Sequence, residues 1–315
     1  MNSILAFLNS LPGAAGQGLI WGIMAIGVYI TYRILDVSDL TVDGSLATGG
    51  AVCAVAISLG LNPWLAMLLA VLTGMLAGLV TGFFHTKCGI PAILSGILTQ
   101  LALYSINLRI MAIGSKATTM ATVALNVDNH NLLLSSRYVR RLGLENPLIL
   151  LILAVVLVIG ALYWFFGTEM GCSLRATGAN QNMARAQGIN TDFSKVLALV
   201  VANGLVALSG ALLAQYQGSA TVDMGRGAIV IGLAAVIIGE VLFSKIFINF
   251  ALKLLACIIG AIIYYAVITL VLRLGLESTD LKLLTALVVA LFLTVPQLKG
   301  KHHHKKAKEG SHAYN

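Results

Sequence analysis

Charged residues are scarce in this sequence. Of its 315 residues only 10% are Asp, Glu, Lys or Arg, whereas a soluble domain carries about 25%. The first basic residue is Arg33, so the N-terminus lacks the basic region of a secretory signal peptide and should remain in the mature protein. The four cysteines, Cys53, Cys88, Cys172 and Cys257, show no paired spacing. These absences exclude an ordinary soluble domain, a disulfide framework and a cysteine zinc site.

Motifs for enzymatic chemistry are also missing. The sequence contains no G-x-x-x-x-G-K-[ST] loop, no H-E-x-x-H, no G-x-S-x-G and no C-x-x-C pair. We therefore expect no ATP hydrolysis by this chain itself, no catalytic residues and no resident metal or cofactor. The adjacent histidines 302–304 lie in a lysine-rich tail and are interpreted as part of a solvated segment. A membrane enzyme or assembly factor is accordingly disfavoured.

Long apolar segments fill most of the chain. Hydrophobic residues make up 58% of it, the mean hydropathy is +0.93 and 32 residues are glycine. This composition is typical of an all-α, polytopic membrane protein with tightly packed helices. Residues 1–11 are too short to span and predict an interfacial helix or a loose start, and 228–243 is short enough to be re-entrant. About nine membrane-spanning helices are expected, with a range of eight to ten. The expected crossings are 14–33, 45–60, 63–84, 90–112, 147–166, 195–216, 228–243, 246–273 and 280–296.

Proline and glycine support this division. Each proline falls at an expected helix end, where a missing N–H costs least. The five prolines are Pro12, Pro63, Pro91, Pro147 and Pro296. Gly74, Gly78 and Gly82 recur every four residues in the third crossing and predict a close contact with another helix.

The basic residues predict an orientation. We expect one transmembrane domain, 1–296, followed by a basic tail, 297–315, that lies in the cytoplasm. Counting back through nine crossings places 168–195 inside and the N-terminus outside. Lys116, Arg137, Arg140 and Arg141 do not fit this scheme, because they fall in the long loop that it places outside. Arg273 and Lys282, near the last outer turn, do not fit it either.

A short repeat suggests internal symmetry. Thr41-Val42-Asp43 returns as Thr221-Val222-Asp223, each followed by a glycine-rich apolar segment. The expected orientation puts the first copy near the inner side and the second near the outer side, as in transporters with inverted repeats. The three matched residues favour neither an inverted repeat nor a chance match.

The longest polar, glycine-punctuated interval is TEMGCSLRATGANQNMARAQGINTDFSK, residues 168–195. It predicts a short helix between tight turns. Ala184 and Gly188 lie one helical turn apart, so a partner surface could approach that face closely, and Arg175 and Arg185 could form ion pairs with the partner. The candidate contact residues are Gly171, Arg175, Ala176, Gly178, Asn180, Ala184, Arg185, Gly188, Ile189 and Asn190.

Few polar groups interrupt the apolar segments. They are candidates for a substrate pathway, although helix–helix hydrogen bonds and caps are the commoner roles for such residues. The pathway candidates are Asp43, Gln100, Tyr104, Asn107, Asn203 and Asp223. Glu240 and Lys253 flank the turn at 244–245, where we expect them to reach the membrane surface or to pair with each other. An ion-coupled secondary transporter is the main alternative function, and it would require Glu240.

Residues 171–190 match the pattern G-x-x-x-R-A-x-G-x-N-x-x-x-A-x-x-x-G-I-N. This stretch resembles the cytoplasmic coupling loop of ATP-binding-cassette importer permeases of the branched-chain amino acid and ribose type. MGRGAIVIGLAAVIIGE (224–240) resembles a glycine-rich segment of the same family. YRILDVSDLTVDGSLATGGAV (32–52) is most similar to a less characterised branch associated with amino acid uptake, tryptophan and tyrosine among the suggested solutes. The resemblance extends over about residues 15–296.

This resemblance implies a permease subunit of an importer, not an enzyme, in the bacterial inner membrane. Two copies of the chain would surround a central pathway for a small solute such as an amino acid. A separate ATPase would bind ATP and magnesium beneath them and contact 168–195, and an extracytoplasmic binding protein or lipoprotein would deliver the solute. The sequence leaves the identity of the solute open.

Overall fold

The computed structural model describes residues 2–115, 117–125, 132–134, 146–243, 246–247 and 249–273, together with the single positions 283, 286, 287, 290 and 294. The expected crossing 280–296, apart from those five helical positions, and the tail 297–315 lie outside this part of the chain. So do Lys116, Arg137, Arg140, Arg141 and Lys282. Of the residues that do not fit the orientation scheme, Arg273 is described, as the last residue of α10.

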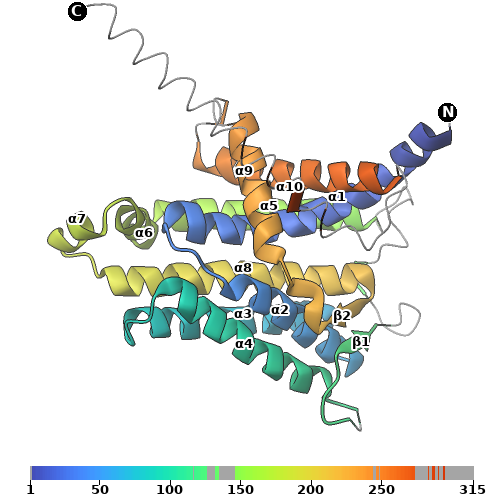
Figure 1. Ribbon diagram of the computed structural model, residues 1–315, viewed down its shortest axis with the longest axis horizontal. Coiled ribbons are helices and arrows are strands. Elements are labelled where there is room, and N and C mark those ends of the chain that lie inside the picture. The colour runs from blue at the N-terminus through green and yellow to red at the C-terminus, as the bar shows by residue number, and fades with distance from the viewer. Residues whose placement is uncertain are drawn as a thin grey trace, which may run out of the picture.

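Helices account for nearly all of the described chain (Figure 1). In order they are α1 (Asn2–Tyr29), the π-helical turn η1 (Ile30–Ile34), α2 (Thr41–Ser58), α3 (Pro63–Thr86), α4 (Ala92–Met111), α5 (Pro147–Gly167), α6 (Glu169–Ala179), α7 (Gln181–Ala186), α8 (Thr191–Gln217), the short 3-10 helix η3 (Val222–Gly225), α9 (Ala228–Phe243) and α10 (Phe250–Arg273). Two short strands, β1 (Thr122–Ala124) and β2 (Ser219–Thr221), complete the described elements.

Eight helices in the described residues are long and apolar enough to cross a membrane. They coincide with the first eight expected crossings and begin and end within a few residues of them, so the all-α, multi-pass prediction is confirmed. Pro63 and Pro147 begin α3 and α5, and Pro91 immediately precedes α4, as predicted. The fold class therefore follows from apolar length and proline position.

Two details of the prediction were wrong. Residues 1–11 do not form a separate element, because α1 runs continuously from Asn2. Pro12 lies inside α1 and not at a helix end. A proline removes a single intrahelical hydrogen bond, and membrane helices tolerate this where neighbouring groups satisfy the freed carbonyl.

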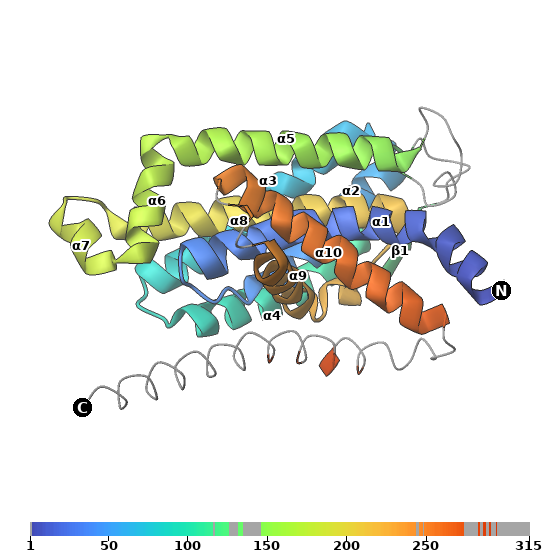
Figure 2. The ribbon, with the colours of Figure 1, turned by 90° about the horizontal axis from the view of Figure 1, so that it is seen from above.

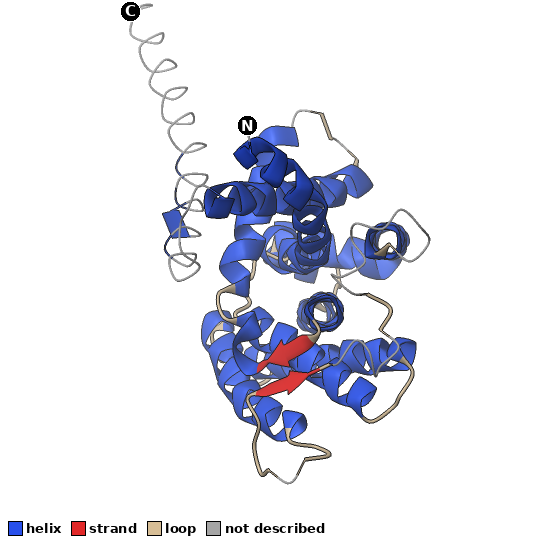
Figure 3. Ribbon diagram, turned by 90° about the vertical axis from the view of Figure 1, so that its right-hand side faces the viewer, coloured by secondary structure: helices blue, strands red, loops and turns tan. Residues whose placement is uncertain are grey.

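The long helices form a bundle with two distinct ends (Figures 1 and 2). One end carries α6 and α7, which project beyond the other helices, and is called here the α6–α7 end. The opposite end carries the strands and is called the β1–β2 end. There β1 pairs antiparallel with β2, with Val123 opposite Ala220, so the α4–α5 connection is tied to the α8–α9 connection (Figure 3).

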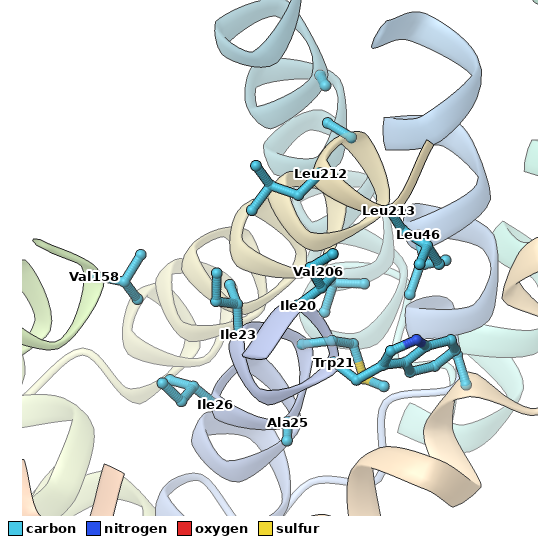
Figure 4. Packing of buried hydrophobic residues seen from close by; sticks show 14 of the residues in the cluster. Ile20, Trp21, Ile23, Ala25, Ile26, Leu46, Val158, Val206, Leu212 and Leu213 are labelled. Carbon is cyan, nitrogen blue, oxygen red and sulfur yellow. The ribbon is translucent and has the colours of Figure 1, made fainter. Parts of the chain in front are cut away.

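The core is built around α1 and α8. Ile20, Ile23 and Ile26 of α1 are fully buried, and Val206 and Leu213 of α8 pack in the same cluster (Figure 4). Leu46 of α2 joins them. Because α8 contacts α1, α2 and α3, it joins α1 on one side to α2 and α3 on the other.

Glycine allows α3 and α8 to touch through their backbones. A Cβ at Gly74 would lie 2.5 Å from the Asn203 carbonyl oxygen, one at Gly78 would lie 2.7 Å from the Leu199 carbonyl carbon, and one at Gly82 would lie 3.0 Å from the Cα of Val196. The predicted glycine contact stripe is confirmed, and its partner is α8.

This contact generates a prediction about stability. Gly78→Ala should lower the free energy of unfolding by about 1–3 kcal/mol, because the added methyl forces α3 away from α8. Gly160→Ala is the matched control: Gly160 is also helical, but nothing lies within 4 Å of its Cβ position, so alanine should leave stability unchanged or raise it by about 0.5–1 kcal/mol. Thermal unfolding of the two variants in one detergent is the measurement, and equal effects would contradict the contact.

Candidate functional site

The segment 168–195 folds as two short helices, where the sequence predicted one. Each helix start has a polar cap. The Thr168 hydroxyl accepts a hydrogen bond from the Gly171 N–H at 3.4 Å, the Asn180 side chain from the Met183 N–H at 3.0 Å, and the Asn190 side chain from the Phe193 N–H at 3.1 Å. The two asparagines of the sequence pattern therefore begin α7 and α8. The second helix was missed because Asn180 was not recognised as a cap.

Glycines fix how this segment sits on the bundle. A Cβ at Gly178 would collide with the carbonyl group of Ile34, and one at Gly171 would collide with the backbone of Phe166. Gly188 follows α7 with a φ of +82°, a conformation that favours glycine. Thus α6 packs directly on the end of η1, and Gly188 reverses the chain between α7 and α8.

The two arginines have partners within the chain. Arg175 donates to the Phe166 carbonyl, and its guanidinium carbon lies 5.7 Å from the centre of the Phe250 ring. Arg185 donates to the Thr191 hydroxyl at 2.8 Å and to the Asp192 carboxylate at 3.2 Å. These contacts hold α6 to α5 and α10, and α7 to α8, so both arginines brace the segment from within.

The exposed surface of α7 differs from the predicted one. Ala184 is 3% exposed and faces inward, while Gly188 is exposed, so the two small residues do not form one exposed face. Ala176 and Ile189 are half-buried. The large apolar side chains around α7 that point outward are Met183, 63% exposed, and Phe193 at the start of α8, 55% exposed; Met170 of α6 is exposed as well. Sequence spacing alone did not single out this pair.

A second feature is a pair of helix starts inside the bundle. The Asp39 carboxylate accepts the Thr41 N–H at 2.9 Å, which caps α2, and also accepts the Asn203 side-chain amide at 2.7 Å. The Ser45 hydroxyl donates to the side-chain oxygen (Oδ1) of Asn203 at 2.6 Å. Asn203 is fully buried and fully bonded, so it joins α2 to α8. Among the pathway candidates it has the helix–helix role.

The Asp43 carboxylate caps α9. It accepts the N–H groups of Gly227 and Ile229, each at 2.9 Å. The first Thr-Val-Asp copy thus begins α2, and the second forms β2 and η3, from which the chain turns into α9. The two copies meet, because Asp43 of the first holds the helix that follows the second. The inverted repeat itself stays a prediction.

Pathway candidates from α2 and α4 meet around a hollow of about 370 Å³. Gln100, Tyr104 and Asn107 share one face of α4, at i, i+4 and i+7, and Asp43 and Arg226 approach from the other side. Asp223 is not among the lining residues, but its carboxylate pairs with Arg226 at 2.9 Å. Arg226 was missed, because nothing in the sequence showed that the chain before α9 turns back into the bundle.

Asn107 is the unusual member of this group. It is 1% exposed, and neither its side-chain nitrogen nor its oxygen has a hydrogen-bond partner among the described residues. Most buried amides are satisfied, and leaving one unpaired costs about 1–3 kcal/mol per group. Asn107 lines the hollow, but its amide atoms are covered, so a polar molecule there would reach them only after neighbouring side chains move.

One predicted ion pair is replaced by another. Glu240 of α9 pairs with Arg33 of η1 at 2.9 Å, not with Lys253. The pair lies at the α6–α7 end and is partly exposed. The described residues contain no group of three His, Cys, Asp or Glu side chains that could hold a metal ion.

A family model described as "Branched-chain amino acid transport system / permease component" matches residues 11–295. The chain belongs to this permease family. It is therefore a transport component and not an enzyme, as the sequence predicted. The match includes every residue of the α6–α7 segment and of the hollow.

Individual relatives agree with this assignment. A tyrosine transport system permease protein of Clostridioides difficile is 42% identical over 291 residues, which cover 92% of each chain. An uncharacterized protein of Rickettsia prowazekii is 34% identical over 93% of this chain and 99% of its own length. The ribose import permease protein of Escherichia coli is 26% identical over 74% of this chain and 69% of its own.

A solved structure shares the fold. PsaBC from Streptococcus pneumoniae, in complex with Fab, superposes with a TM-score of 0.53 at 17% sequence identity, over 93% of this chain and 94% of that one. At this identity the likeness concerns the fold alone.

The two aspartates of the repeated Thr-Val-Asp generate a prediction for this permease. Asp43→Ala should lower the free energy of unfolding by about 2–3 kcal/mol, because it removes the acceptor for two N–H groups at the start of α9. Asp223→Ala breaks an exposed ion pair and should cost less than about 1 kcal/mol. Chemical or thermal unfolding of both variants is the measurement, and a larger loss in Asp223→Ala would show that Asp43 is not the cap.

Proposed function

We propose that this permease is the membrane-spanning subunit of an ATP-binding-cassette importer in a bacterial inner membrane. In this proposal a separate ATPase binds ATP and magnesium and docks on the α6–α7 segment. Two copies of the chain surround the pathway, and an extracytoplasmic binding protein or lipoprotein delivers the solute. The observation that carries the proposal is the braced, projecting α6–α7 segment with an apolar tip.

The physical design of the segment supports this role. A segment that transmits force needs a contact surface outside and firm attachment inside. Met183 and Phe193 supply exposed apolar area of the kind that forms interface anchors. Arg175, Arg185 and the close approach at Gly178 supply the attachment. A merely solvated loop would need neither.

Charge supports an orientation with the α6–α7 end in the cytoplasm. Basic residues gather at that end, and cytoplasmic ends of membrane proteins are rich in Lys and Arg. The described ones are Arg33, Lys87, Arg175, Arg185, Lys195 and Lys253. In this orientation α1 starts outside, and the proposal needs the expected crossing 280–296 to return the C-terminus to the cytoplasm.

The hollow between α2 and α4 is the proposed part of the solute path. Its volume of about 370 Å³ lies within the range of pockets that hold small ligands, about 300–1,000 Å³. Its open side continues onto the exposed face of α4, where Leu101 and Tyr104 lie; in the proposed homodimer the second copy closes it. The similarity to a tyrosine transport permease makes an aromatic amino acid the proposed solute.

An ion-coupled carrier is the alternative that the structure weakens. Its case depended on Glu240 as a relay, yet that carboxylate is paired with Arg33 and partly exposed at the α6–α7 end. Relay acids are usually held within the membrane interior. Glu240 is better explained as a link between α9 and α1.

Purification of the chain from its native cells in mild detergent, with co-purifying proteins identified by mass, tests the proposal. We expect an ATPase and a binding protein in the complex, and ATP-dependent uptake when the complex is placed in liposomes. A chain that purifies alone and moves labelled tyrosine without ATP would overturn the proposal in favour of a secondary carrier.

The contact surface of α7 can be tested directly. Met183→Asp should weaken ATPase retention about tenfold or more, because a charge replaces an apolar anchor, without changing the thermal stability of the chain alone. Leu61→Asp is the control, since Leu61 is 40% exposed but lies in the α2–α3 turn at the opposite end. Normal ATPase retention in Met183→Asp would contradict docking on α7.

The two buried asparagines give opposite expectations. Asn107→Leu should leave stability unchanged or raise it by about 1–2 kcal/mol, since it removes an unpaired amide, yet should lower uptake of the solute that the binding protein delivers. Asn203→Leu should lower stability by about 2–3 kcal/mol, because Asp39 and Ser45 lose their partner. Thermal unfolding and uptake are measured on both variants. Full uptake by Asn107→Leu would show that the hollow is not part of the solute pathway.

A further inference from the structure

A basic hollow beside the α6–α7 segment has no part in the solute path. Its volume is about 390 Å³, and it lies where the end of α1, the end of α6 and the start of α10 meet. Three cationic side chains line it: Arg33 of η1, Arg175 of α6 and Lys253 of α10. They come from elements distant in the sequence, so the charge cluster is produced by the fold.

The charge in this hollow is incompletely balanced. Arg33 pairs with Glu240. Arg175 is held by a backbone carbonyl and by the Phe250 ring, which fix its position but do not neutralise it. Lys253 is exposed, and its ammonium group has no hydrogen-bond or ion-pair partner among the described residues. Three cations therefore face one carboxylate, and the hollow favours an anion.

The residues around the basic hollow indicate its depth in the membrane. A second hollow, of about 490 Å³, shares Arg175 and Phe250 with the first and is also lined by Tyr163 and Trp164. Trp164 is 74% exposed and lies in the last turn of α5, a helix that is strongly apolar and mostly unburied. Exposed Trp and Tyr at the end of a membrane helix mark the level of the lipid headgroups.

We propose that Arg33, Arg175 and Lys253 bind the phosphate-bearing headgroup of an anionic phospholipid, whose acyl chains lie along the exposed face of α5. Basic hollows between membrane helices on the cytoplasmic side suit such headgroups. Because Arg175 belongs to α6, the bound lipid braces the base of the α6–α7 segment. The inference rests on the proposed orientation, with the α6–α7 end in the cytoplasm, but it does not depend on the proposed solute or ATPase.

The test uses the full-length chain in neutral detergent and measures lipid binding by native mass spectrometry, with lipid-dependent thermal stability as a second readout. Phosphatidylglycerol should bind more tightly than phosphatidylcholine and should raise the unfolding temperature more. Lys253→Gln should weaken phosphatidylglycerol binding about fivefold, the effect of one basic residue near a charged membrane surface. Lys253→Glu should weaken it further.

Lys87→Gln is the matched control. Lys87 is an exposed lysine at the same end of the bundle, at the end of α3, and it does not line the hollow, so this variant should bind phosphatidylglycerol normally. Inorganic phosphate and glycerol 3-phosphate form a further arm, and they should not reproduce the effect. Equal binding of the two lipids, normal binding by Lys253→Gln, or an equal response to free phosphate would each overturn the lipid assignment.

Discussion

The structure depends on how two helices begin within the bundle. The first N–H groups of any helix lack partners within it, and inside a membrane protein they must find acceptors from the protein itself. Here α2 begins against the Asp39 carboxylate and α9 begins against the Asp43 carboxylate. Because Asp39 precedes α2 and Asp43 lies in its first turn, that one turn supports both helix starts. The bundle can then admit two connections between its long helices, one at 35–40 and one at 218–227 that includes β2 and η3.

Close helix packing makes these joints possible. Asp39 reaches Asn203 only because α2 and α8 touch, and glycine brings α3 and α8 together on the adjacent face. Gly96 of α4 similarly lets the backbone at Leu40 pass close by, since a Cβ there would lie 2.8 Å from the Leu40 nitrogen. The many glycines of the sequence are thus a condition for the polar network as well as for helix contact. Without them the carboxylates would be buried but out of reach of their partners.

The sequence predicted the membrane-spanning helices well, but it predicted their caps and the contacts between them poorly, and the reason is physical. Apolar length and proline position determine where a helix can cross, and both are local properties; eight crossings followed from them. A cap such as Asp39 on Thr41 is also local and could have been found from an aspartate two residues before the α2 start. The Glu240–Arg33 pair, the inward position of Ala184 and the unpaired amide of Asn107 depend on three-dimensional packing. The Asp223–Arg226 pair is local, at i and i+3, and sequence spacing could have suggested it. Four pathway candidates line one hollow: Asp43, together with three residues that helical spacing places on one face of α4. Asn203 does not line it, because its side of α8 packs against α2.

A continuous chain of contacts joins the α6–α7 segment to the hollow. Gly178 of α6 packs on Ile34 of η1, and Arg33 of η1 pairs with Glu240 of α9. The other end of α9 is held by Asp43, which lines the hollow. A helix is stiff along its axis. Displacement of η1 relative to the bundle must therefore either break the Arg33–Glu240 pair or move α9, which strains the hydrogen bonds between Asp43 and the start of α9. The partly exposed ion pair is the weakest of these links, and the backbone contact at Gly178 is the least compressible. One route from the α6–α7 segment to the hollow therefore runs through α9, whose two ends are fixed by single charged side chains.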